Sequence, residues 1–556
     1  MLTDEQKRDL KLVNDAFDKI DSKYKPNWLE YERMYESEHT AAYKKATEEQ
    51  DRNSIFIPLT YSTISIADSV FTTSFFSQGN PIELLKIGDN DADKRSALAT
   101  VVNYYYEKAK PYNELSKSFL SASLFGIGAV KVYWDDDSAL PETDMIPPTE
   151  VAFDIDAISR KDTQYISHRF KQTLNDIRDR FKSKFYKCKE ANDKDTVIEP
   201  TEENGYKRKL IKEIYTKKGK TWQVRTFCGE VCIREVKFKK CPIKHGYLLT
   251  RLPRIDDADR EHQIAAIGDS LARIIKPLNE ELNIKRNQRM DLIERLINPE
   301  VYIPKTCSVD PEDAKKIGGI KSCDATTGIM FVPTQGASEF TNDVMMLKND
   351  IEDASSINGI MRGATNASDR RSSTALATVN ANSSIRLESM IKLINETLFE
   401  EWARDFVRLC YINVDDALVM ELTESETNPL GAKGIRPELD IDIKVNFGAS
   451  INKQAKIQDL LSIVQMVANR KNADVDTVIK EVIKLILGEN TNVEKILGVS
   501  NQSGDANPPI QNQGVEGSQS AADIEQRGEK GGNGDPIQSV GDAGNRELDK
   551  LRNNEV

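Results

Sequence analysis

The feature that constrains the fold most is an amphipathic stretch that runs from Ile267 to Ile297. Its apolar residues recur mostly at three- and four-residue spacing, and this periodicity predicts one long helix with a single apolar stripe. Asn298 ends the helix, because a residue before a proline is pushed out of helical conformation. Pro277 predicts either a kink or a helix that begins further along the chain. The stripe comprises Ile267, Leu271, Ile274, Leu278, Leu282, Leu292, Ile293, Leu296 and Ile297, and it lapses over Lys285, Arg286 and Arg289.

Length and charge limit what the whole chain can be. With 556 residues, the chain is expected to form roughly two to four structural units. Charged residues make up 30% and the net charge is −12, so non-specific wrapping of nucleic acid by bulk charge is not expected. An acidic surface would instead repel a polyanion and let it slide past.

No targeting or membrane segment is expected. The first five residues, Met1 to Glu5, lack the basic and apolar regions of a signal peptide. No run of about 18 apolar residues exists, so the sequence predicts no membrane-spanning helix.

Seven cysteines form an odd and scattered set, which favours a reducing compartment over a disulfide framework. Cys228, Cys232, Cys241 and His245 could be interpreted as a loose zinc site. Their spacing matches no standard zinc knuckle, however, and the neighbouring residues favour strands with buried thiols. The second interpretation is preferred, and the first stays open.

The first half of the chain predicts helices followed by a small antiparallel sheet. A helical region is expected over 1–50. An extended segment that ends at Pro58 is followed by a helix over 59–76, and a further helical region over 92–124 is interrupted at Pro111. Strands are expected at 129–134, 151–153 and 165–170, then a helix at 174–185 and a strand-rich region over 208–253.

The glycine pair Gly126 and Gly128 could suggest a nucleotide-binding loop. A dinucleotide fingerprint follows a strand and opens a helix, whereas here a helix leads into a strand. The glycines are therefore expected to allow a sharp turn and close packing.

The second half predicts short strands, long helices and a disordered tail. Short proline-edged strands at 301–304 and 328–333 cannot form a domain alone and could pair with strands of neighbouring copies. Residues 358–373 form a polar loop with Arg362, Arg370 and Arg371, expected to be mobile. Helices are expected at 341–357, 374–412 and 455–496, strands near 418–422 and 441–447, and disorder from residue 498 onward.

Motifs of common enzymes are absent from the sequence. It contains no Walker loop, no HExxH and no GxSxG, and its four histidines lie in no acid–base constellation. We therefore expect neither an enzyme nor a bound cofactor.

Four stretches, in this order, resemble the portal (head-to-tail connector) proteins of tailed bacteriophages, particularly those of podoviruses. They are NSIFIPLTYSTI from Asn53, FGIGAVKVYW from Phe125 with a following Pro148–Asp154 strand, GDSLARIIKPLNEELNIKRNQRMDLI from Gly268 with NPEVYIP, and INGIMRGATNASDRRSSTALATVNANSSIRLESMI from Ile357. The resemblance covers roughly residues 50–495.

The resemblance implies an α+β, mainly helical portal fold assembled as a ring, a dodecamer in the family. Its implied regions are a wing (1–263), a first stem helix (264–298), a clip (299–340), a second stem helix (341–357), a tunnel loop (358–373), a long wing helix with strands (374–449) and a short crown (450–497), followed by the tail (498–556). The short crown departs from the long helical barrel of some podovirus portals, and the tail has no counterpart.

The implied function is a channel at one capsid vertex for packaging and ejection of double-stranded DNA. The implied partners are further copies of the chain, the major capsid protein, scaffolding protein, the terminase large subunit and head-completion or tail adaptor proteins. The implied location is the virion, and the host cytoplasm during assembly. A phage scaffold or adaptor without a channel, or a motor subunit with nuclease or ATPase activity, remain the alternatives.

Two sets of residues are candidates for sequence-independent DNA contact. The tunnel-loop set is Arg362, Asn366, Ser368, Arg370 and Arg371, and the stem set is Lys285, Arg286 and Arg289. For the stem set, a solvated face or salt bridges to a neighbouring subunit are equally open.

Overall fold

The computed structural model describes residues 2–50, 52–76, 79–85, 92–180, 206, 208–251, 264–297, 301–302, 330–331, 339–355, 357, 385–434, 436 and 442–445. The chain divides into two compact units, Met1–Leu485 and Ile486–Val556, and every described residue lies in the first. None of the described helices is long and apolar enough to cross a membrane.

The chain begins with a helical segment, as expected. Helix α1 (Asp4–Lys19) starts at a capping box formed by Thr3 and Gln6, continues through a π-helical turn and passes into α2 (Lys25–Tyr35). After α3 (Ala41–Glu49), an extended segment leads into α4 (Leu59–Phe76). This extended segment, residues 53–57, is called the arm below.

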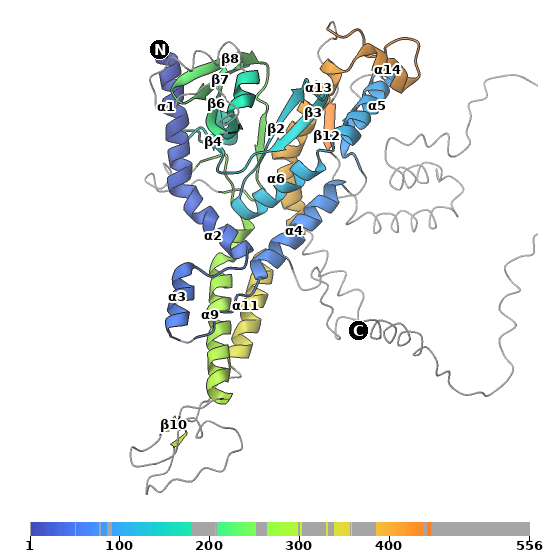
Figure 1. Ribbon diagram of the computed structural model, residues 1–556. Helices are drawn as coiled ribbons and strands as arrows, with labels where there is room; N and C mark the ends of the chain where they lie inside the picture. The colour runs from blue at the N-terminus through green and yellow to red at the C-terminus, as the bar shows by residue number, and fades with distance from the viewer. Residues whose placement is uncertain are drawn as a thin grey trace, which may run out of the picture. The chain divides into compact units, whose positions relative to one another are not determined.

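A five-stranded antiparallel sheet follows in the order β4-β5-β6-β7-β8. Side chains alternate between its faces, so Arg225 and Thr226 on β7 point in opposite directions. Arg225 meets Asp9 of α1 in a buried ion pair, which places α1 on that face of the sheet (Figure 1). The strands are β4 (Val151–Phe153), β5 (Tyr165–Thr173), β6 (Arg208–Lys218), β7 (Thr221–Cys228) and β8 (Val231–Phe238).

A second antiparallel sheet, in the order β3-β2-β9, comprises β2 (Gly128–Asp135), β3 (Leu140–Met145) and β9 (Ile243–Gly246). Helices α5 (Ala92–Ala109) and α6 (Tyr112–Phe125) pack against it, separated at Pro111 as the sequence predicts. The turn from α6 into β2 confirms the structural interpretation of the glycines, because Gly126 has φ +81° and its Cβ would lie 2.6 Å from the Gly268 carbonyl oxygen.

The largest apolar core lies where α4, α5 and α6 meet a long C-terminal helix. That helix spans 385–394, a π-helical turn Asn395–Phe399 and α13 (Glu400–Asn413). Phe399 stacks on Phe75 and Phe119 with ring centroids 4.4 and 4.5 Å apart. The buried Trp402 donates a hydrogen bond from Nε1 to Thr143 Oγ1 at 3.1 Å. These contacts fix α13 beside β3.

Helices α9 (Leu271–Ile297) and α11 (Glu339–Ser355) lie side by side away from this core (Figure 1). Between them in sequence, β10 (Val301–Tyr302) pairs with β11 (Met330–Phe331) in an antiparallel bridge. Far along the chain, β12 (Asp442–Val445) pairs with β1 (Ile82–Leu85).

The described elements confirm an α+β fold and differ from the sequence predictions at several positions. Residues 418–422 lie in helix α14 (Asp416–Thr423), because Leu418, Val419 and Leu422 also fit one helical turn. Pro277 lies inside α9, so the helix does not begin after it. β10 and β11 pair with each other. The strands β1 and β3 were not predicted from the sequence. The predicted helix at 455–496 and the tail fall outside the described residues.

Candidate functional site

The candidate site is the helix pair α9–α11 with the arm that packs against it. The two helices meet through an apolar seam in which Leu282 faces the Val344–Ile351 side of α11. The seam is formed by Ile275, Leu282, Val344, Leu347 and Ile351, with Leu59 at the start of α4 completing the cluster. At about 25 cal/mol per Å² of buried apolar surface, such a seam is the main stabilising contribution between the two helices.

The second side of α9 binds the arm through a row of polar side chains. Asn283, Asn287 and Asp291 follow one another at four-residue spacing and therefore share one face of the helix. The arm is extended, so its backbone N–H groups on alternate residues point the same way and meet that row. The bonds are Ile57 N–H to Asn283 Oδ1 at 2.7 Å, Ile55 N–H to Asn287 Oδ1 at 2.8 Å and Asn53 N–H to Asp291 Oδ1 at 2.9 Å.

The arm is also held from the side of α3. The His39 ring lies 4.4 Å from Tyr43 and 5.0 Å from Phe56, centroid to centroid, and its Nε2 lies 3.0 Å from the Ile55 carbonyl oxygen. Burial lowers the pKa of His39, which keeps the ring neutral in this sandwich at neutral pH. The arm therefore has side-chain partners on both flanks.

The charges of the two helices are complementary. Helix α9 carries six basic and four acidic side chains, whereas α11 carries one basic and five acidic ones. Lys285 of α9 forms an ion pair with Asp343 of α11, with its Nζ 3.2 Å from Asp343 Oδ2. This pair is partly exposed and contributes at most about 1 kcal/mol.

The predicted basic cluster is thus divided by the structure. Lys285 is paired within its own chain. Arg286 and Arg289 are half-buried and make no hydrogen bond or ion pair with any described residue, and Arg289 Nε is buried without a partner. The structure therefore separates Lys285, which has a partner on α11, from Arg286 and Arg289.

The other predicted site residues have different outcomes. Arg362, Asn366, Ser368, Arg370 and Arg371 of the polar loop fall outside the described residues. Cys228, Cys232 and Cys241 form no disulfide among the described residues. Burial raises the pKa of Cys241 to about 12 and lowers that of His245. Among the described residues, no group of three or more histidine, cysteine or acidic side chains is placed to hold a metal ion.

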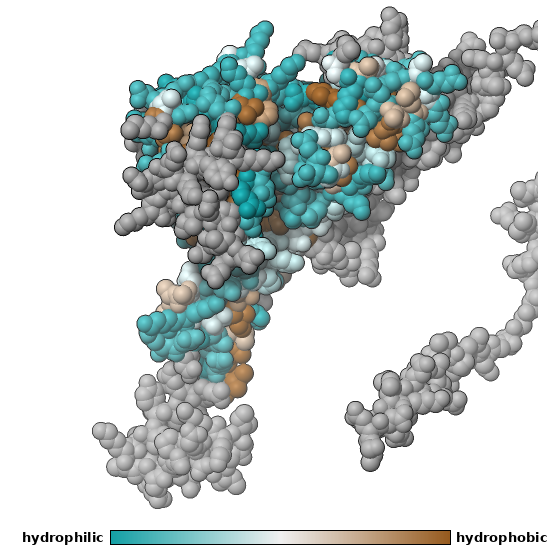
Figure 2. Space-filling view, turned by 45° about the horizontal axis from the view of Figure 1, so that its top comes forward, coloured by the Kyte–Doolittle hydropathy of each residue, from teal (hydrophilic) through white to brown (hydrophobic). Residues whose placement is uncertain are grey.

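Large apolar side chains are exposed on the helix pair. Met345 and Met346 of α11 are 60% and 64% exposed, and Ile297 in the last turn of α9 is 59% exposed. Figure 2 shows apolar residues along one edge of the pair, with hydrophilic residues on the other. Contiguous exposed apolar surface is typical of a protein–protein contact.

The polar side chains of α9 that bind the arm were not predicted from the sequence, although the sequence contains a signal for them. Asparagine is a poor helix former, and three asparagines at 279, 283 and 287 on one helix face need a reason outside the helix. The spacing alone does not say which segment they bind, because the arm lies more than two hundred residues earlier in the chain.

No family model matches the chain, and the search of curated proteins found no match. Among the solved structures that match in part are two of gene transfer agent particles. The neck of an empty gene transfer agent particle, computed with C6 symmetry, has 10% identity and a TM-score of 0.38, and the virion of a native gene transfer agent particle has 12% and 0.34. Each alignment covers 78% of this chain and 90% of the other. Both scores are too low to show a shared fold.

Proposed function

We propose that the chain is a portal protein of a tailed bacteriophage or phage-like particle. Copies of it would form a closed ring at one capsid vertex, through which double-stranded DNA is packaged and ejected. The proposal rests on the order of the four portal-like sequence stretches and, above all, on the helix pair α9–α11. The exposed apolar edge of this pair is typical of a surface that packs against another protein chain.

The physical argument starts from the faces of the helix pair. One side of α9 is used by α11 and a second by the arm. Met345 and Met346 remain in solvent on α11, where side-by-side packing of further copies would bury them. If the same contact is repeated between subunits by rotation about one axis, the subunits form a closed ring and each contributes one helix pair to the wall of the channel.

DNA contact would be electrostatic and independent of sequence. Arg286 and Arg289 supply cations without partners among the described residues, and Arg362, Arg370 and Arg371 supply three more in the polar loop. The net charge of −12 suits a channel that lets DNA slide and does not grip it.

The same proposal gives the chain a non-enzymatic role in the virion, with assembly in the host cytoplasm. Its partners would be the major capsid protein, scaffolding protein, the terminase large subunit and head-completion or tail adaptor proteins. No cofactor enters this function.

The contact between copies is tested by light scattering coupled to size-exclusion chromatography. We expect the wild-type protein to elute as a large, defined oligomer, and Met345→Glu/Met346→Glu to elute as a monomer with an unchanged circular dichroism spectrum. The matched control is Leu29→Glu/Ile158→Glu, which places two charges at exposed apolar positions outside the pair, 55% and 84% exposed. A monomeric wild type, or a double methionine variant that still forms the oligomer, contradicts the proposal and favours an adaptor or scaffold.

A further inference from the structure

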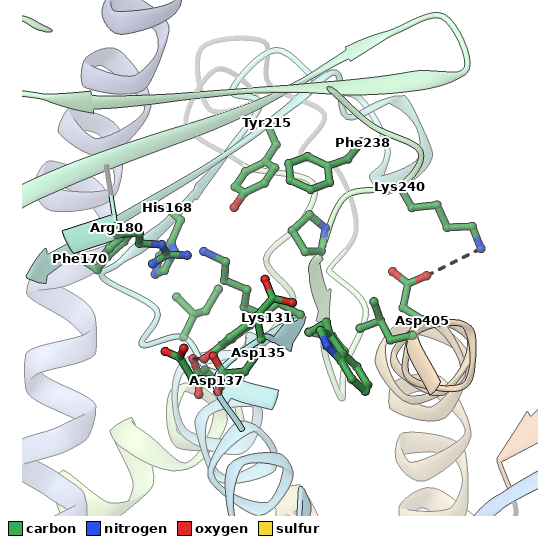
Figure 3. Close-up of a pocket in the computed structure, with 18 of the residues that line it drawn as sticks. Lys131, Asp135, Asp137, His168, Phe170, Arg180, Tyr215, Phe238, Lys240 and Asp405 are labelled. Atoms are coloured by element: carbon green, nitrogen blue, oxygen red, sulfur yellow. Dashed lines mark hydrogen bonds and ion pairs between the residues drawn. The ribbon is translucent and has the colours of Figure 1, made fainter. Parts of the chain in front are cut away.

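A cleft of about 1720 Å³ lies between the two sheets, far in sequence from the helix pair. Its walls come from β2 and β3 on one side, β5, β6 and β8 on the other, and α13 at one end (Figure 3). None of the contacts described above for α9, α11 and the arm involves it.

One wall of the cleft is the face of the five-stranded sheet that α1 leaves uncovered. His168, Glu213, Thr226 and Arg234 are partners in register across β5, β6, β7 and β8, so they share this face. Glu213 is fully satisfied here. It accepts from Lys131 Nζ of β2 at 2.8 Å, Tyr215 OH at 2.7 Å and Thr226 Oγ1 at 3.3 Å.

Two polar atoms on β5 are buried in this wall without a hydrogen-bond partner among the described residues. They are Nδ1 of His168, a residue that is only 9% exposed, and Oε1 of Gln172. Both residues line the cleft, and their four-residue spacing on a strand places them on the same face as Phe170. Burial lowers the pKa of His168 to about 3, so the ring is neutral and Nδ1 can accept a hydrogen bond. Buried acceptors of this kind are normally satisfied, which points to a donor that enters from the cleft.

The rim of the cleft is acidic. Eight acidic and five basic side chains line it, and Lys131 is already committed to Glu213 while Lys240 pairs with Asp405. The acidic excess gathers at the β2–β3 turn, Asp135–Asp137, where Figure 3 shows Asp135 and Asp137 side by side, and at Asp144 on β3. Apolar side chains also line the cleft, among them Trp134 of β2, Phe170 of β5 and Phe238 of β8.

We propose that this cleft binds an extended, basic segment of a partner protein. Lysine or arginine side chains of that segment would meet the Asp135–Asp137 turn and Asp144, and its donors would satisfy Gln172 Oε1 and His168 Nδ1. Alternate apolar side chains would lie against Trp134 and Phe170. A phosphate-bearing ligand does not suit the acidic rim, and the described side chains offer no metal site. The inference stands on the cleft alone and does not depend on ring formation.

Fluorescence anisotropy with two labelled peptides tests this. The probe is a short peptide of alternating lysine and leucine, and its counterpart replaces lysine by glutamate. We expect the full-length protein to bind the lysine peptide and not the glutamate peptide. Asp135→Asn/Asp137→Asn/Asp144→Asn should weaken binding of the lysine peptide about tenfold, since three rim charges are lost. Equal binding of the two peptides overturns the proposal.

The matched control is Asp4→Asn/Glu48→Gln/Glu49→Gln, which removes three exposed acids outside the cleft and should change the affinity less than about twofold. If both triple variants weaken binding equally, the attraction is bulk charge and the site is refuted. Gln172→Leu keeps every charge and should weaken binding about threefold through the lost acceptor. An unchanged affinity in Gln172→Leu, with an unchanged melting temperature, overturns the placement of the segment along β5.

Discussion

Asn287 and Ile55 exchange two hydrogen bonds across 232 residues of sequence. The Ile55 N–H donates to Asn287 Oδ1 at 2.8 Å, and Asn287 Nδ2 donates to the Ile55 carbonyl oxygen at 3.0 Å. The asparagine side chain thus supplies the hydrogen-bond partners that a neighbouring strand would otherwise give to the extended backbone at Ile55. The arm is thereby fixed to α9 before α4 begins, which ties the N-terminal helices to the helix pair.

Asn287→Ala should destabilise the protein by about 2 kcal/mol, because it leaves both backbone groups of Ile55 without this partner. Urea unfolding followed by circular dichroism measures the change. Gln288→Ala is the control, since Gln288 is the exposed neighbour on the same helix and should change stability by less than about 0.5 kcal/mol. Equal effects of the two substitutions would show that the arm contributes nothing to stability.

Gly126→Ala should be more destabilising than a similar change at a glycine in open space. Both Gly126 and Gly229 have positive φ, +81° and +59°, so alanine is strained by about 1 kcal/mol at either position. Only at Gly126 would the new Cβ meet backbone, 2.6 Å from the Gly268 carbonyl oxygen, which should raise the loss to about 3 kcal/mol. Thermal unfolding of the two variants separates the effects, and similar losses in both would refute close packing at Gly126.

Asp68 on α4 makes stability depend on pH. Burial raises its pKa from the ordinary 3.8 to about 6, and its Oδ1 has no partner among the described residues. The folded state therefore binds more protons than the unfolded state between pH 3.8 and about 6, so this group lowers stability as the pH rises through that window.

Asp68→Asn removes the buried charge and should stabilise the protein by about 1 kcal/mol at pH 7.5. Near pH 4 the carboxyl is protonated in the folded state, so the variant and the wild type should melt at nearly the same temperature. Melting curves at both pH values check this. A difference that is the same at both would show that the charge of Asp68 is not the cause.

The arginines of the polar loop are predicted to act on DNA and not on assembly. Arg362→Ala/Arg370→Ala/Arg371→Ala should leave the oligomer intact and lower the yield of packaged or retained genome, because three phosphate contacts are lost. Arg362→Lys/Arg370→Lys/Arg371→Lys keeps the charge and should restore most of the yield. An unchanged genome yield in the alanine variant would refute the role of the loop.

Local patterns in the sequence predicted most elements whose stabilising contacts are close in sequence. The stripe through Leu271 and Leu282 predicted α9, and Pro111 predicted the break between α5 and α6. Errors arose where a short segment fits two conformations. Leu418 to Leu422 was predicted as a strand and is a helix, and β3 was missed because Pro141 and acidic residues hide its alternation.

Long-range pairing lay beyond what the sequence pattern could predict. The β1–β12 ladder pairs Ile82 with Val445, and the polar side chains on α9 bind the arm. In both cases the sequence of one segment does not indicate which distant segment it pairs with. For the candidate site, the basic cluster was predicted as a unit, yet only the structure separates Lys285, which pairs with Asp343, from Arg286 and Arg289. The reason is that α11 supplies the acidic partner, Asp343. Which residue of α11 faces Lys285 depends on how the two helices pack through their apolar side chains.

Cryo-electron microscopy of the purified full-length protein tests the central claim most directly. The portal proposal predicts a closed, rotationally symmetric ring with an axial channel wide enough for a DNA duplex, in which the α9–α11 pairs lie side by side and bury Met345 and Met346. A stable monomer, or an open filament without an axial channel, would contradict it.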